Sequence, residues 1–443
     1  MQPLFVFALV LVSSFAGFYV FNGRQISFRN ISPTISLSSL FLFSIAVFQA
    51  AAQSSSLEVL IAIVAVAAIL NPLASNVVQR SGQPGILNVF IRILYFYLLT
   101  AAVIRALQEI GLNPILIAGY GITMLVYARA SPKIGWTATQ GLNTLVAIAS
   151  LYAATALTIP PEILPVFTLV LLLALSTAPK AFLEKSDAAI VVILSAALIF
   201  VFLGVFLSPF ADAEKPLNVE IGLNVFAVLA VVFASVGLSG EKPAASLSDT
   251  FLFAAASALA FAGPSFHQSL ATLLTPLTGL PSINLTTQIS LYMMQFFGLA
   301  TLFALLNKIV EYAATIQNKL IQKSSFTNQV FAVGAVAFAV FASISTDLAT
   351  LLSLAGSTSL AFVSALLPTM TRNKLVLFPC FALFLVAANL VMLNVLTETE
   401  ASLLITTGNV PKIISSAFAV SATVTAAWLL AGNVSNLLRR KAF

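Results

Sequence analysis

The sequence predicts an all-α integral membrane protein. We expect residues 1–443 to form a single bundle of about fifteen transmembrane helices, within a range of about 12 to 15, and no soluble domain. Of the 443 residues, 60% are hydrophobic and only 8% are charged, whereas a soluble domain has about 25% charged residues. The apolar residues form continuous runs, not the alternating segments of about ten residues that build a transmembrane β-barrel. Almost every charge lies in a short gap between two such runs.

Each expected helix is an apolar run bounded by polar or charged residues. In chain order, the fifteen runs span residues 3–22, 34–52, 59–78, 86–107, 112–128, 142–159, 164–179, 188–208, 221–239, 250–273, 287–306, 329–352, 353–371, 375–396 and 413–436. Residues 329–371 are too many for one crossing, so we expect an uncharged break near residues 353–356 to divide them into two helices. The polar gap at 307–328 is expected to hold a short amphipathic helix at the inner surface.

The first run is expected to be an uncleaved helix. It has no basic residue before it and no clean small-residue cleavage site, so it does not read as a removable signal peptide. Its basic residues, Arg24 and Arg29, come after it. Because basic residues stay on the cytoplasmic side, this arrangement predicts an N-terminus outside.

The charges in the later gaps predict the same orientation. With fifteen helices and the N-terminus outside, the inner gaps and the C-terminus contain sixteen Lys and Arg residues. The outer gaps contain two, Lys215 and Lys412, together with eight of the fourteen acidic residues. A wrong helix count would reverse every later gap and remove this bias. We therefore expect the C-terminus to be cytoplasmic.

Three charges remain inside the expected helices, namely Arg92, Arg105 and Asp347. An ionisable residue within a membrane helix suggests a functional site. Asp347 is expected about one and a half turns from the outer end of its helix, where Ser343 and Thr346 complete a polar patch for a cation, a proton or a substrate amine. The alternative is a helix-end carboxylate that reaches outer water.

The two arginines have structural alternatives. Arg105, near the outer end of its helix, could pair with Asp347 across the bundle, or its side chain could extend to the membrane interface. Arg92 lies near the inner end of the same helix, where extension to the interface is the favoured interpretation.

A second candidate site surrounds His267. Pro264 removes one helix hydrogen bond and frees a carbonyl group that a ligand could use. Gln295 lies on a polar side of the next expected helix and could face the same cavity. The alternatives are a kinked helix with a satisfied histidine, and polar contacts that only hold helices together.

The stretch from Asp347 to Ser359, followed by Pro368, Arg372 and Lys374, resembles the late helices of amino acid/auxin permease-type transporters. Those proteins have a similar run of Asp, Ser, Leu, Gly and Ser that joins two helices near the outer face. The resemblance implies a transporter and marks Asp347, Gly356 and Ser357 as candidate ligand-binding residues. The glycine-rich broken first helix of that family is missing here.

Composition excludes several classes of function. Cys380 is the sole cysteine and His267 the sole histidine, which rules out iron–sulfur ligation, bis-histidine haem ligation and a zinc protease site. Neither a catalytic residue set nor a phosphate-binding loop is recognisable, so we expect no cofactor and no metal, and the sequence favours a protein without enzyme activity while leaving a transferase open. No basic tract interleaved with aromatic residues indicates a nucleic-acid partner.

Three functions stay open. The first is secondary active transport of a small solute, with proton or sodium coupling as an option. The second is a core membrane subunit of a larger energy-converting, proton-pumping complex, which would have other membrane subunits as partners. The third is a lipid or glycan flippase or a membrane-embedded transferase. In every case the lipid bilayer is a partner, and the sequence does not distinguish a bacterial inner membrane from an organellar one.

Overall fold

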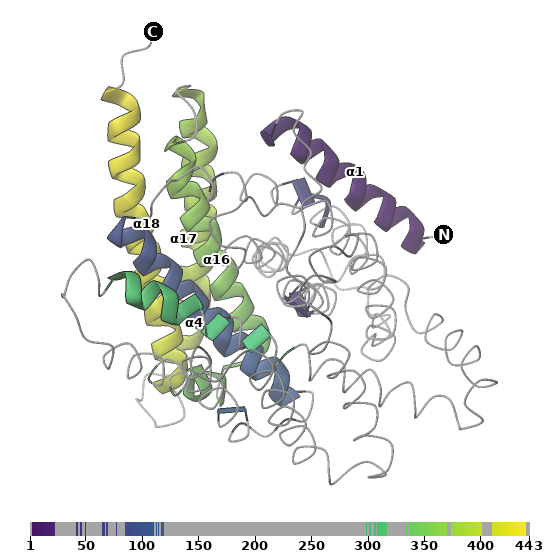
Figure 1. The fold of residues 1–443 in the computed structure, drawn as a ribbon, viewed down its shortest axis with the longest axis vertical. Coiled ribbons are helices and arrows are strands. Elements are labelled where there is room, and N and C mark those ends of the chain that lie inside the picture. Colours follow the sequence, from purple (N-terminus) through teal and green to yellow (C-terminus); the bar gives the residue numbers. More distant parts are fainter. Residues whose placement is uncertain are drawn as a thin grey trace, which may run out of the picture.

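The computed structural model describes residues 2–22, 85–109, 346–369, 374–400 and 410–439. It also describes single residues and short segments between 41 and 118 and between 298 and 344 (Figure 1). Every regular element in these described parts is a helix, and none is a strand. The all-α prediction is therefore confirmed for this part of the chain.

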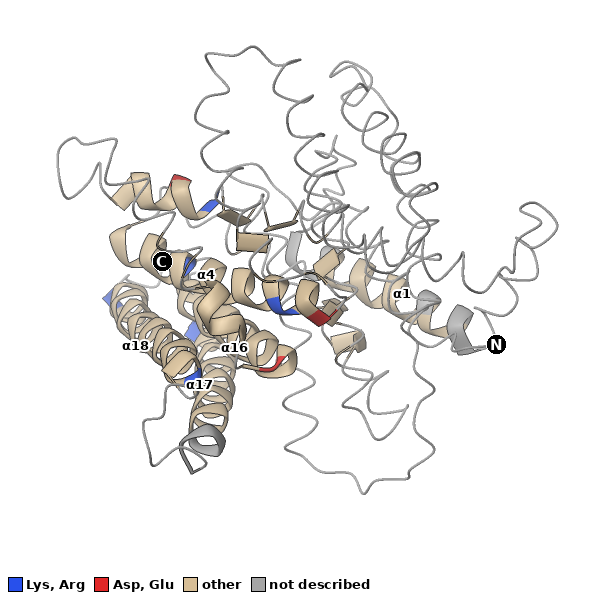
Figure 2. Ribbon diagram, turned by 90° about the horizontal axis from the view of Figure 1, so that it is seen from below, with Lys and Arg blue, Asp and Glu red and all other residues tan. Residues whose placement is uncertain are grey.

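Four of the helices are long and apolar enough to cross a membrane. They are α4 (Ile86–Glu109), α16 (Leu348–Leu366) with the short η2 (Leu367–Thr369), α17 (Leu377–Glu400) preceded by η3 (Lys374–Val376), and α18 (Val410–Arg439). Figure 2 shows how rarely charged residues interrupt these helices. The described part thus has the helices expected of a membrane protein.

Most observed boundaries lie close to the predicted ones. Helix α1 (Gln2–Asn22) coincides with the expected run at 3–22, and α4 extends the run at 86–107 by one half-turn. Helices α17 and α18 each run three or four residues beyond the expected C-terminal end. Hydropathy marks the apolar run, while the helix itself continues into the polar residues beside it.

The break between the two helices expected at 329–371 lies elsewhere than predicted. Residues 341–344 are helical and α16 begins at Leu348, so the interruption comes before residue 348 rather than near residues 353–356. The physical reason is a helix cap. Asp347 has an extended backbone and its carboxylate accepts a hydrogen bond from the Thr350 amide, which stabilises a helix start at this position.

Helix α16 is the centre of the described bundle. It packs against α4, α17 and α18 (Figure 1). Of an 18-residue apolar stretch within α16 and η2, 94% is buried inside the structure. Its sequence, LATLLSLAGSTSLAFVSAL, alternates leucine with small residues and contains no charge. Small residues let neighbouring helix backbones approach closely, which is the main means of helix packing in a membrane.

Two interhelical hydrogen bonds establish how the helices run. Asn394, late in α17, donates to the Ser353 hydroxyl early in α16 at 3.0 Å, so α16 and α17 are antiparallel. Asn433, late in α18, donates to the Ala365 carbonyl late in α16 at 2.8 Å, so α16 and α18 are parallel. The C-terminal end of α4 lies beside the residues that precede α16, which makes α4 antiparallel to α16.

Helices α17 and α18 present apolar side chains on the outside of this bundle. In α17, only 22% of the corresponding 18-residue apolar stretch is buried. In α18, the buried share is 39%. The most exposed apolar side chains of the two helices are those of Phe378, Leu385, Val424 and Trp428. An exposed apolar surface of this extent is what lipid covers in a membrane protein.

Candidate functional site

Asp347 lies at the start of α16 and not inside a helix. Its backbone is extended (φ −69°, ψ 156°), and its Oδ2 accepts a hydrogen bond from the Thr350 amide at 2.9 Å. The residue is exposed. The expected position one and a half turns inside a helix is therefore wrong, and the helix-end carboxylate is the arrangement observed.

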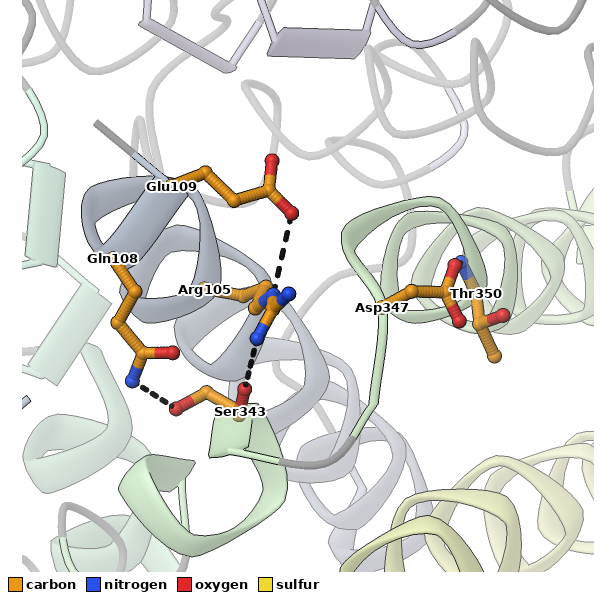
Figure 3. Close-up of polar contacts among 6 residues, drawn as sticks. All are labelled: Arg105, Gln108, Glu109, Ser343, Asp347 and Thr350. Atoms are coloured by element: carbon orange, nitrogen blue, oxygen red, sulfur yellow. Dashed lines mark hydrogen bonds and ion pairs between the residues drawn. The ribbon is translucent and has the colours of Figure 1, made fainter. Parts of the chain in front are cut away.

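Arg105 does not pair with Asp347 in the described part of the chain. Its Nε lies 3.2 Å from Glu109 Oε1, one turn later in α4, and its Nη1 donates to the Ser343 carbonyl at 3.5 Å. Figure 3 shows the guanidinium between Glu109 and Ser343, while the Asp347 carboxylate faces Thr350. The two side chains of the ion pair are 30% and 39% exposed, so the pair contributes about 0–1 kcal/mol.

Ser343 and Thr346 are both buried, and Ser343 lies beside this pair. The Ser343 hydroxyl donates to the Val340 carbonyl at 2.7 Å and accepts from Gln108 Nε2 at 3.0 Å. The Thr346 hydroxyl has no hydrogen-bond partner among the described residues. The expected polar patch is thus divided, because Ser343 binds to α4 whereas Asp347 caps α16 (Figure 3).

Gly356 and Ser357 lie in the buried middle of α16. The Ser357 hydroxyl donates to the Ser353 carbonyl at 2.7 Å, one turn earlier. Thr358 and Ser359 also donate to carbonyl groups of α16 itself, at 2.8 Å. A hydroxyl satisfied within its own helix presents an almost apolar surface, which suits close helix packing. A ligand-binding role for Gly356 and Ser357 stays a prediction.

The second candidate site, around His267 and Gln295, lies outside the described residues. The same holds for Pro264. That site stays a prediction based on the sequence.

Arg92 has a more specific environment than its sequence position suggested. Its Nη1 donates to the Tyr312 hydroxyl at 3.0 Å. Its Cζ lies 5.6 Å from the centroid of the Tyr312 ring and 5.5 Å from that of Phe362 in α16. Tyr312 in turn stacks on Phe96, with 5.7 Å between ring centroids. Aromatic faces attract a cation, so the guanidinium is held inside the bundle by residues of two other segments.

The segment that contributes Tyr312 is helical from 308 to 316, within the gap where an amphipathic helix was expected. Ile309 and Tyr312 are buried, and Lys308 forms an ion pair with Glu311 at 2.7 Å. Tyr312 lies against α4 through its contacts with Arg92 and Phe96.

Four buried polar atoms on α4 have no hydrogen-bond partner among the described residues. Three of them, Asn88 Oδ1, Arg92 Nε and the Tyr95 hydroxyl oxygen, belong to side chains on one face, and the fourth is the Tyr97 hydroxyl oxygen. Asn88 is 5% and Tyr95 7% exposed, so neither side chain is substantially solvated. Residues at i, i+4 and i+7 share one helix face. A buried polar group without a partner costs about 1–3 kcal/mol, and such a group therefore requires an explanation.

The sequence contains a signal for this face that the positions of the charges alone do not reveal. Asn88, Arg92 and Tyr95 have helical spacing within an otherwise apolar helix, and their shared face could have been found from spacing alone. The contribution of Tyr312 could not, because it lies 220 residues away along the chain. Among the described residues, no group of three or more His, Cys, Asp or Glu side chains could hold a metal ion.

The candidate site of this protein is therefore the polar face of α4 around Arg92, whereas Arg105, at the other end of α4, is paired with Glu109 and lies outside it. Comparison of the chain with family models, curated proteins and solved structures finds no match, so its function has to be argued from these residues.

Proposed function

We propose that the protein is a multi-pass membrane protein that transports a small solute by secondary active transport. The observation that supports this most directly is Arg92. It is a guanidinium in a helix of membrane-spanning length, and no carboxylate pairs with it in the described part of the chain. Charged residues inside membrane helices usually mark a substrate or ion pathway, because their burial is otherwise unfavourable.

The depth of Arg92 supports this assignment. Helix α4 has 24 residues, which is about 36 Å at a rise of about 1.5 Å per residue. Centred on a hydrocarbon layer of about 30 Å, it would place Arg92 about 6 Å inside the edge of that layer. Arg92 is also directed at aromatic rings of neighbouring segments instead of extending freely to the interface.

We further propose the topology of about fifteen crossings, with the N-terminus outside and the C-terminus cytoplasmic. The relative directions of the four spanning helices agree with it. Helices α4 and α17 run one way and α16 and α18 the other, as required of the fourth, thirteenth, fourteenth and fifteenth crossings. The resemblance of residues 343–374 to amino acid/auxin permease-type transporters agrees with the transport proposal as well.

Reconstitution into liposomes tests the proposal. We expect the purified protein to accelerate uptake of at least one solute from a panel of labelled carboxylates, amino acids, sugars and monovalent cations. We expect Arg92→Gln to reduce that rate at least about tenfold, because a charged hydrogen bond contributes about 1.5–3 kcal/mol. Arg105→Gln is the matched control, since Arg105 already has Glu109 as a partner.

The other functions predict different results in the same experiment. Absence of flux for every solute, together with stoichiometric co-purification of other membrane subunits, would favour a core subunit of a larger complex. Movement of a fluorescent lipid between leaflets without solute flux would favour a flippase. Either outcome would refute solute transport.

A further inference from the structure

We propose that the polar face of α4 around Arg92 binds a small organic carboxylate. This inference rests on the transport proposal and names the class of solute. It starts from the placement of three side chains. Asn88, Arg92 and Tyr95 lie on one face of α4, and each has a buried polar atom without a partner among the described residues. A ligand that supplies those partners would remove the cost of their burial.

The charge of the ligand follows from the pairing of the cations. Arg105 has Glu109 at 3.2 Å, and Lys308 has Glu311 at 2.7 Å. Arg92 is also partly buried, yet among the described residues its partners are one hydroxyl and two aromatic rings. A buried charge is stable when it is paired. An anion is therefore the ligand that this position favours.

The geometry of the guanidinium narrows the anion to a carboxylate. The Tyr312 hydroxyl occupies Nη1, and the rings of Tyr312 and Phe362 lie near its Cζ. The edge formed by Nε and Nη2 has no hydrogen-bond partner in the described residues, and Nε is buried. Two parallel N–H donors on one planar edge match the two oxygens of a carboxylate. A phosphate group has more oxygens and usually requires further donors or cations.

Asn88 and Tyr95, on the same face as Arg92, indicate a second polar group on the ligand. The Tyr95 hydroxyl can donate to an oxygen, and Asn88 Oδ1 can accept a hydrogen bond from a ligand. A carboxylate that also has a hydroxyl or amino group could use one of these groups as well as the guanidinium. Lactate, with one carboxylate and one hydroxyl, is the simplest probe with these features, and acetate lacks the second.

The test is ligand-induced thermal stabilisation of the full chain in nanodiscs of phosphatidylcholine. We expect lactate to raise the unfolding temperature of the wild type and of Arg105→Gln to a similar extent. Arg92→Gln and Arg92→Lys should weaken lactate binding about tenfold or more, because Lys keeps the charge but lacks the planar pair of donors. Tyr95→Phe, which keeps the ring, should weaken lactate binding about threefold to tenfold, and acetate should bind more weakly than lactate.

Several results would overturn the inference. One is unchanged lactate binding in Arg92→Gln and Tyr95→Phe, and another is no lactate binding to the wild type. Equal stabilisation by inorganic phosphate would make the site a general anion site, and equal stabilisation by phosphatidylglycerol in the nanodisc would make it a lipid headgroup site. Lactate binding without solute flux would support the carboxylate site and contradict the proposal of transport. Flux of a cation or sugar without lactate binding would support transport and contradict the proposal that this site binds a carboxylate.

Discussion

At the scale of single residues, a charge in an apolar helix is informative only when its partners are known. Asp347 obtains its partner locally, from the Thr350 amide of the helix it begins. Arg105 obtains its partner one turn away, from Glu109. Arg92 has no carboxylate partner among the described residues, and its contacts come from Tyr312 and Phe362. Arg92, for which the sequence favoured extension to the membrane interface, therefore has the most unusual environment of the three.

The cap formed by Asp347 gives a prediction about stability. Asp347→Ala should lower the free energy of unfolding by about 0.5–2 kcal/mol, because alanine cannot accept the hydrogen bond from the Thr350 amide. Asp347→Asn should leave the stability nearly unchanged, since asparagine caps helices as well as aspartate does. Thermal unfolding of the two variants in the same detergent measures the difference.

The same pair of variants separates capping from ion binding by Asp347. If the carboxylate only caps α16, the Asn variant should keep any measured solute flux. Loss of flux at wild-type stability would instead assign a charge-dependent role to Asp347, and equal destabilisation by Ala and Asn would contradict the cap.

At the scale of elements, small residues decide which face of an apolar helix is buried. Helix α1 is apolar all round and contains no charge, so its sequence gives no amphipathic pattern. In the structure, Ser13 and Ser14 are buried on one face and the larger Phe15 and Tyr19 are exposed on the other. Small residues inside and large ones outside is the arrangement that lets membrane helices approach closely. Gly17 continues the buried face.

Gly17 gives a prediction about this contact. A Cβ added at Gly17 would lie 2.5 Å from the Ile69 carbonyl oxygen, closer than real Cβ atoms approach. Gly17→Ala should therefore destabilise the protein by about 1–3 kcal/mol, through displacement of α1. Gly432→Ala in α18 is the matched control, because nothing lies within 4 Å of its added Cβ and alanine favours a helix by about 1 kcal/mol.

Thermal unfolding of both glycine variants in detergent is the measurement. The sign of the change should differ between them, with Gly17→Ala below and Gly432→Ala at or above the wild type. Equal stabilisation of both would show that α1 does not pack closely at Gly17.

At the scale of the whole molecule, the directions of the spanning helices constrain the topology. Because α4 and α16 are antiparallel, an even number of crossings has to separate them if both cross the membrane. The eight crossings proposed between them satisfy this condition. The contacts of α16, α17 and α18 agree with three successive crossings near the C-terminal end.

The topology predicts which side of the membrane each helix end faces. Cys380 is the sole cysteine and is fully buried in α17, so the wild type should react little with a membrane-impermeant maleimide. In a Cys380→Ala background, a cysteine at Glu109 or Lys412 should react from outside intact cells. A cysteine at Lys374 or Arg439 should react only after permeabilisation. Reaction of both sets from the same side would contradict the proposed orientation.

Much of the fold of the described part could be predicted from the sequence, whereas the contacts that the candidate site makes with distant segments could not. The apolar runs predicted α1, α4, α17 and α18 to within a few residues. The break before α16 was misplaced at the uncharged residues 353–356, whereas the helix begins after the cap that Asp347 forms with the Thr350 amide. Both the runs and the cap depend on residues close together in the chain, and for that reason both are open to sequence reasoning.

The sequence by itself determined that this chain builds apolar helices of membrane-spanning length, because about 20 consecutive residues decide that property. It also determined which side chains are charged, including Arg92. Only the tertiary structure decided that the Arg92 guanidinium meets Tyr312, 220 residues away, and that it has no carboxylate partner in the described part. The physical reason is that a helix apolar on all sides does not specify its neighbours, so contacts between distant segments arise only when the bundle packs.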